Sequence, residues 1–164
     1  MGFFNLVKLV SLYVYFIGLL YLFYGFIGLI DGIISWWTPW SVNLQAGFSL
    51  AGTLIPSVKA DPFRGFVLVV IGLIFVKGGR YLIKGKPDSW GYLTVGLIIS
   101  GTVAGLNLAI TLAHLLDKLY PPLLGLKVND LHNLMKEGWL TDPGLILFPL
   151  ALIGYLTYRK IKPL

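Results

Sequence analysis

An uncharged run from Trp90 to Leu116 is the feature that most constrains the fold of this chain. It holds 27 residues without Lys, Arg, Asp or Glu. A helix of about 20 apolar residues crosses the hydrocarbon core of a bilayer, so the run is long enough to span a membrane. Composition agrees, because 57% of all residues are hydrophobic and only 12% are charged, against about 25% in soluble domains. We therefore expect an integral membrane protein.

Three further segments complete a predicted bundle. Lys8 and Asp31 bound an uncharged stretch, and two Asp-Pro pairs, at 61–62 and 142–143, can each cap a helix and place proline in its first turn. The predicted spans cover residues 9–30, 62–83, 90–116 and 143–159. The sequence thus predicts an all-α, four-transmembrane-helix bundle made of two helical hairpins in one membrane domain, residues 1–164.

The distribution of basic residues predicts the orientation. Most Lys and Arg residues fall on one side of a four-span arrangement, which the positive-inside rule assigns to the cytoplasm. They are Lys8, Lys77, Arg80, Lys84, Lys86, Arg159, Lys160 and Lys162. We expect a cell-membrane protein with both termini cytoplasmic. The outer connections, 31–60 and 117–141, are expected to be interfacial or re-entrant, with a fifth span over 41–58 as the alternative.

The two halves of the chain share a plan that suggests a weak parallel repeat. Each half has a long outgoing helix, an outer connection, an Asp-Pro start and a shorter returning helix with a basic end. Ile71-Gly72 and Ile153-Gly154 occupy comparable places in the returning helices. Any two hairpins that begin their second helix with Asp-Pro would also look alike, so both interpretations stay open.

Glycines recur at helical spacing along three predicted spans. Residues seven apart share a helix face, and small residues four apart let membrane helices approach closely. The glycines concerned are Gly18, Gly25 and Gly32, then Gly65, Gly72 and Gly79, and finally Gly101 and Gly105. We expect packing surfaces here, either within the bundle or toward another subunit.

The third predicted span carries a narrow polar face. Ser100, Asn107, Thr111 and His114 lie within about 80° of arc at 100° per residue. Polar side chains at membrane depth turn inward and find hydrogen-bond partners, and Tyr21 or Tyr24 from the first span is a candidate partner. The face is expected either to pack between helices or to line a hydrophilic path.

Several classes of site find no support in the sequence. The chain has no cysteine, which excludes disulfides and thiolate chemistry. No catalytic residues, metal ligands or cofactor are predicted, because the two histidines are far apart and no nucleophile lies beside a base. Nucleic-acid binding is not expected either, since the basic residues flank membrane spans. The lipid bilayer and other membrane subunits, or copies of the chain itself, are the expected partners.

The most economical hypothesis is a non-catalytic, multi-pass subunit of a larger membrane complex, of an ion-translocating or energy-converting kind. A homo-oligomeric ion channel or small-solute transporter is the alternative. A third hypothesis is a lipid-modifying membrane enzyme that uses His114 and Asp117, which are three residues apart on one helix.

Overall fold

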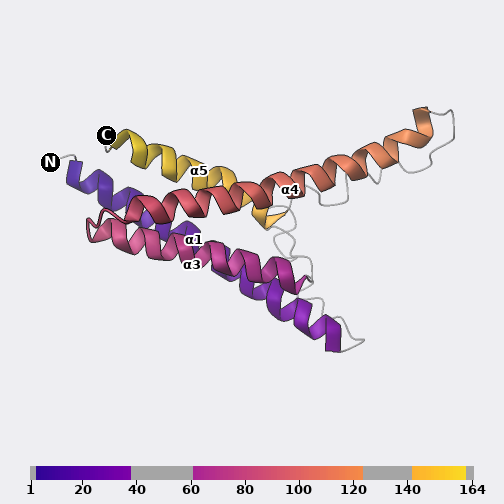
Figure 1. Cartoon of the computed structure of the whole chain (residues 1–164), viewed down its shortest axis with the longest axis horizontal. Helices are drawn as coiled ribbons and strands as arrows, with labels where there is room; N and C mark the ends of the chain where they lie inside the picture. The colour runs from indigo at the N-terminus through magenta and orange to yellow at the C-terminus, as the bar shows by residue number, and fades with distance from the viewer. Residues whose placement is uncertain (1–2, 38–60, 124–141, 162–164) are drawn as a thin grey trace, which may run out of the picture.

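All regular structure in the described part of the chain is helical. The structure is a computed structural model, and it describes residues 3–37, 61–123 and 142–161. Its four helices are α1 (Phe3–Trp37), α3 (Pro62–Ile83), α4 (Ser89–Leu123) and α5 (Pro143–Ile161). In the view of Figure 1, α1 and α3 cross each other in the lower part of the bundle, and α4 and α5 lie above them. By length and composition three segments could cross a membrane: Leu6–Trp37, Pro62–Ile83 and Ser89–Ala113. The predicted segment 41–58 lies outside the described residues.

An antiparallel contact between α1 and α3 forms the tightest part of the bundle. A Cβ added at Gly25 would lie 2.6 Å from the backbone nitrogen of Val69, and one added at Gly72 would lie 2.7 Å from that of Leu22. No ordinary side chain fits at such a distance, so glycine allows the two backbones to touch. We call this contact the glycine seam. Its members are Gly18, Gly25 and Gly32 on α1, and Gly65, Gly72 and Gly79 on α3.

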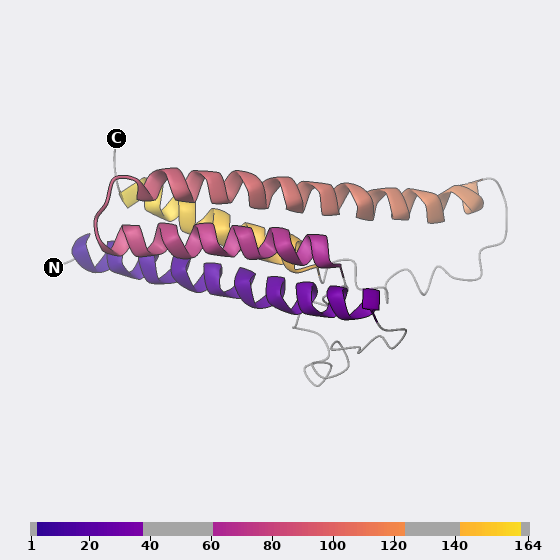
Figure 2. The same ribbon diagram turned by 60° about the horizontal axis from the view of Figure 1, so that its bottom comes forward.

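The remaining core lies where α4 and α5 pack onto this pair. Tyr21 and Phe75 are fully buried with their rings stacked, 5.8 Å between centroids. Leu93 of α4 and Leu147 of α5 belong to the same cluster. In Figure 2, α4 lies above α3, with α5 behind them. The described helices therefore share one apolar core.

Both long helices extend past their predicted ends. The expected first span stops at Ile30, yet α1 continues to Trp37. Asp31 does not close the helix and is only 4% exposed. The reason is packing: Gly32 rests on Pro62, and Trp36 meets the ring of Phe63 edge-on at 5.7 Å. Packing along the glycine seam thus extends α1 beyond Asp31, the residue expected to end the span.

A tight turn joins α3 to α4. The amide of Gly85 donates to the carbonyl of Leu82, and the amide of Lys86 donates to that of Tyr81. This is the Schellman pattern of a helix C-terminus, which needs a left-handed residue after the cap. Gly85 supplies it with a φ of +64°.

Aromatic rings mark both ends of the bundle. At the basic end Trp90 stacks on Tyr155, with 5.0 Å between centroids, while Trp36 and Phe63 pair at the other end. On α3 the step from Phe63 to Tyr81 spans about 27 Å at 1.5 Å per residue, close to the roughly 30 Å of a hydrocarbon core. Because aromatic rings favour the headgroup level, these two levels fit the two faces of a bilayer.

The glycines expected to correspond in a repeat differ in their surroundings. Gly72 faces Gly18 and Leu22 of α1, its neighbour in the first half of the chain. Gly154 also faces α1, at Tyr13 and Val14. The three atoms nearest to a Cβ at Gly154 all belong to α1, whereas a repeat predicts α4 at this place.

Candidate functional site: a buried polar cluster

Asp142 is the centre of a polar cluster at the end of the bundle opposite the basic residues. One carboxylate oxygen, Oδ1, accepts from the backbone amide of Gly144 at 2.7 Å and from Nδ2 of Asn107 at 3.2 Å. The first contact caps α5 at its start, in the way that an Asp before a helix satisfies free amides. The second ties α5 to α4.

The other carboxylate oxygen of Asp142 pairs with a cation from a third helix. Nη2 of Arg64, in the first turn of α3, forms an ion pair with Oδ2 of Asp142, and the two side chains are only 17% and 15% exposed. A largely buried charge is costly unless it is paired and hydrogen-bonded. Asp142 therefore joins α3, α4 and α5 through one side chain.

The equivalent residue at the start of α3 serves mainly as a cap. Oδ1 of Asp61 accepts from the backbone amides of Phe63 and Arg64 at 3.0 and 3.2 Å. This arrangement holds the first turn of α3 in place and thereby positions Arg64. We call Arg64, Asn107 and Asp142 the polar cluster.

The predicted polar face of α4 divides between two depths. Asn107 belongs to the polar cluster, and Thr111 donates from Oγ1 to the carbonyl of Asn107 at 2.8 Å. Ser100 lies deeper, 1% exposed, and donates to the carbonyl of Leu97 at 3.0 Å. His114 lies within α4, and its side chain is outside the described part. The structure thus does not bring all four residues into one site.

Tyr21 and Ser100 come close together in the middle of the bundle. Their side chains lie near enough to interact, yet the Tyr21 hydroxyl lacks a partner with hydrogen-bond geometry. The two hydroxyls therefore do not form a hydrogen bond, because such a bond weakens steeply with misalignment. The pair is a point of contact between α1 and α4 at membrane depth.

The remaining predicted glycines on α4 have different environments. A Cβ at Gly101 would meet the ring of Phe148 at 3.0 Å, which marks a contact with α5. Among the described residues, nothing lies within 4 Å of a Cβ placed at Gly105. Gly105 is therefore free of the other described helices, whereas Gly101 packs against α5.

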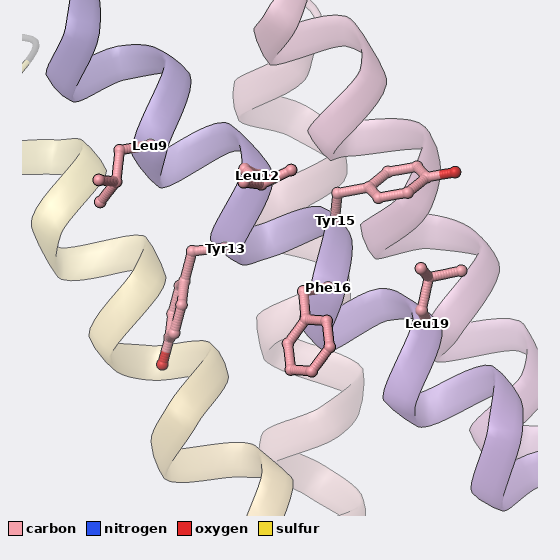
Figure 3. Close-up of a pocket in the computed structure, with 6 residues that line it drawn as sticks. All are labelled: Leu9, Leu12, Tyr13, Tyr15, Phe16 and Leu19. Atoms are coloured by element: carbon pink, nitrogen blue, oxygen red, sulfur yellow. The ribbon is translucent and has the colours of Figure 1, made fainter.

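A shallow apolar groove of about 530 Å³ runs along α1. Figure 3 shows the side chains around it, with Tyr13 reaching toward α5 and Tyr15 toward α3. The lining consists of Leu9, Leu12, Tyr13, Tyr15, Phe16 and Leu19. All of these come from one helix, and several are more than half exposed. The groove is a lipid-facing surface rather than an enclosed pocket.

The family of the chain follows from comparison with known proteins. The family described as the MJ0565 integral membrane domain matches residues 4–160. The chain belongs to this family. No curated protein and no solved structure matches it significantly.

Membership in the MJ0565 integral membrane domain family agrees with the three apolar helices long enough to cross a bilayer. The expectation of a helical membrane protein is thereby confirmed. In the described helices and turns, no three His, Cys, Asp or Glu side chains gather where a metal could bind. The polar cluster of this family member holds a cation and a carboxylate that neutralise each other, which suits it to joining helices.

Sequence reasoning missed Arg64, although a signal for it was present. Arg64 follows Asp61-Pro62 by two residues, and Asp142-Pro143 opens the other returning helix. Two returning helices start on the same side of a membrane, so a basic residue in one first turn can reach the capping Asp of the other. The two Asp-Pro starts indicated where a partner should be sought.

Proposed function

We propose that the protein is a non-catalytic, multi-pass subunit of a larger membrane assembly, and that the outer half of α4 is its docking element. We define the outer half of α4 as residues 105–123. The observation that carries the proposal is a wide exposed apolar face. Leu106, Leu108, Ile110, Leu112 and Leu116 are all between 50% and 65% exposed. At 100° per residue these positions spread over about 200° of the circumference, and the remaining arc holds Asn107 and Thr111.

Lipid accounts for only part of this apolar surface, because the candidate membrane span Ser89–Ala113 ends before Leu116. The 35 residues of α4 extend over about 52 Å, whereas the hydrocarbon core is roughly 30 Å thick. Even at a tilt of about 40°, the upper end of the usual range, α4 would reach through roughly 40 Å of membrane normal. Its last turns therefore leave the hydrocarbon while still carrying Leu116 and Tyr120, exposed at 65% and 63%.

A helical partner fits the shape of this surface. Gly105, Ala109 and Ala113 are spaced four apart and exposed, and nothing lies within 4 Å of a Cβ at Gly105. Small residues at this spacing allow a second helix to pack closely. A helix ordinarily buries a wide apolar face of this kind against another element. The partner class we favour is a transmembrane subunit of an ion-translocating or energy-converting complex.

The proposed topology has four spans in the cell membrane with both termini cytoplasmic. The 19 residues of α5 extend over about 28 Å, nearly the thickness of the hydrocarbon core. Figure 1 draws the start of α1 and the end of α5 at the same end of the bundle. Lys77, Arg80, Lys84, Arg159 and Lys160 lie at that end as well, which the positive-inside rule assigns to the cytoplasm.

Site-specific photocrosslinking in the native membrane tests the docking role. A photoreactive residue at Leu112 or Leu116 should give a discrete adduct with another membrane protein. The control position is Leu73 on α3, which is 55% exposed and faces lipid one turn below the basic end. There we expect adducts with lipid only. Mass spectrometry of the Leu112 adduct identifies the partner.

Two outcomes of this experiment would decide against the proposal. Lipid-only adducts at all three positions would show that the outer half of α4 docks no protein. An adduct that contains only a second copy of this chain would favour the homo-oligomeric channel. In that case Asn107→Leu should reduce ion flux through liposomes that hold the purified protein.

A further inference from the structure

The turn between α3 and α4 gathers two lysines on one pair of tyrosine rings. Tyr81 and Tyr92 meet edge to face, with 5.3 Å between centroids. The ammonium of Lys77 lies 4.8 Å from the Tyr92 centroid, and that of Lys86 lies 5.0 Å from the Tyr81 centroid. Both distances fall within the range of cation–π attraction, about 6 Å.

The local backbone explains why the two lysines converge. Lys77 is four residues before Tyr81 on α3, so the two side chains share a helix face. Lys86 lies beyond the helix end, and its amide bonds to the carbonyl of Tyr81 in the Schellman turn at Gly85. The turn therefore folds Lys86 back toward the same ring. We call Lys77, Lys86, Tyr81 and Tyr92 the lysine–tyrosine site.

Among the residues that the structure describes, no carboxylate forms an ion pair with Lys77 or Lys86. Asp88 is the one acidic residue between positions 77 and 92. The ion pair found in the described part of the chain involves Arg64 and Asp142, at the far end of the bundle. Two exposed ammonium groups held on one pair of rings attract an anion, and a tyrosine hydroxyl can donate a further hydrogen bond.

Apolar surface lies directly beneath the site. Leu73 is one helical turn deeper than Lys77 on α3, and Val95 is about one turn deeper than Tyr92 on α4. These two side chains are 55% and 48% exposed. Trp90 and its stacked partner Tyr155 place this level at the membrane surface. An occupant with an anionic head and an apolar tail matches both parts.

We propose that the lysine–tyrosine site binds the phosphate headgroup of an anionic phospholipid, whose acyl chain lies along Leu73 and Val95. Lysine is a point-charge ligand for phosphate and keeps its charge at the interface. The site differs from diffuse attraction to a charged leaflet, since two ammonium groups are already positioned by the tyrosine rings. Binding here is independent of any partner at α4.

Native mass spectrometry of the full chain in detergent tests the site. The protein is titrated with phosphatidylglycerol, phosphatidylcholine or inorganic phosphate, and the dissociation constant of the first bound molecule is measured. We expect phosphatidylglycerol to bind most tightly. Replacing both lysines, in Lys77→Gln/Lys86→Gln, should weaken its binding about 30-fold, since each basic residue near a membrane surface contributes about fivefold.

A matched variant separates the site from general charge. Lys84→Gln/Arg159→Gln removes the same charge from the same end of the bundle, and we expect less than about a threefold change because neither residue contacts the tyrosine pair. Lys77→Arg/Lys86→Arg keeps the charge and should retain most of the binding even if the glutamine variant folds poorly.

Three results would overturn the proposal. Equal losses in the two glutamine variants would show diffuse attraction without a site. Equal affinity for phosphatidylcholine would show that the acyl chain alone decides binding. Inorganic phosphate that binds as tightly as phosphatidylglycerol would mark a site for a soluble anion, because the tail would then contribute nothing.

Discussion

Arg64 on α3 forms an ion pair with Asp142 at the start of α5, and so connects the two halves of the chain. The pair lies at the level of Phe63, at the end of the bundle opposite the basic residues. Both partners are mostly buried, and Asn107 from α4 hydrogen-bonds to the same carboxylate. Arg64, Asn107 and Asp142 therefore supply one another with the polar contacts that water would otherwise provide.

Breaking this ion pair from one side should be more damaging than removing it altogether. Arg64→Met leaves the carboxylate of Asp142 buried without its cation, which we expect to cost about 3 kcal/mol of unfolding free energy. Adding Asp142→Asn removes the stranded charge and keeps an N-cap, so the double variant should recover at least half of the loss. Unfolding in mixed micelles by sodium dodecyl sulfate measures both. A double variant as unstable as Arg64→Met would show that charge is not the cause.

The glycine seam should tolerate no added methyl group. Gly25→Ala and Gly72→Ala each force α1 and α3 apart, because the new Cβ would lie less than 3 Å from a backbone nitrogen. We expect losses of about 1–3 kcal/mol, typical of overpacking. Gly91→Ala is the control, since its Cβ would point into open space and alanine favours a helix. If Gly72→Ala unfolds no earlier than Gly91→Ala, the close approach is not what stabilises the bundle.

Tyr21→Phe should leave the protein as stable as before or make it more stable. The ring would still stack on Phe75, while a fully buried hydroxyl without a well-aligned partner is removed, which relieves a cost of about 1 kcal/mol. Tyr21→Ala is the contrast and should lose about 3 kcal/mol with the ring. Thermal unfolding in detergent compares the three proteins. A clear loss in Tyr21→Phe would demonstrate a hydrogen bond to Ser100.

Gly85→Ala should destabilise the turn between α3 and α4 by about 1 kcal/mol, because φ is +64° there and a Cβ is unfavourable in this region. Gly85→Asn should cost less, since asparagine adopts the left-handed conformation more readily. Melting temperatures of the two variants provide the comparison. If the Gly85→Ala variant and the wild type have the same melting temperature, the turn adopts another shape without loss of stability.

The sequence could predict those helices whose ends carry their own signals. Asp61-Pro62 predicts the start of α3 at Pro62, and the structure has the Asp61 carboxylate on the amides of Phe63 and Arg64. The C-terminal end of α1 could not be predicted, because a charged residue at position 31 resembles the boundary of a membrane span. Its burial depends on α3 packing against Gly32, a contact distant in sequence. Tertiary packing decides where such a helix ends, and the local sequence pattern carries no information about that packing.

The candidate site was only partly predictable for a similar reason. Asn107 stood out because an amide is conspicuous in an uncharged run, but its partner Asp142 looked like a simple helix cap. One carboxylate performs both roles, since its two oxygens have room for several donors. Arg64 does not stand out in the sequence, because a basic residue near the end of a membrane span is common. Which of several nearby charges pair is a matter of helix rotation, and the sequence alone does not determine it.

The glycine seam makes the spacing between its members as important as their identity. Gly18 meets Gly72 and Gly25 meets Gly65, so the contact keeps one register along both helices. Inserting a single residue between Gly18 and Gly25 would turn one glycine away from the other by about 100°. Point substitutions on the lipid-facing side of α1 leave that register unchanged, whereas an insertion or deletion anywhere along it separates the two helices. Chains with this fold can therefore vary widely in composition, but the spacing between the seam glycines of α1 must continue to match that of α3.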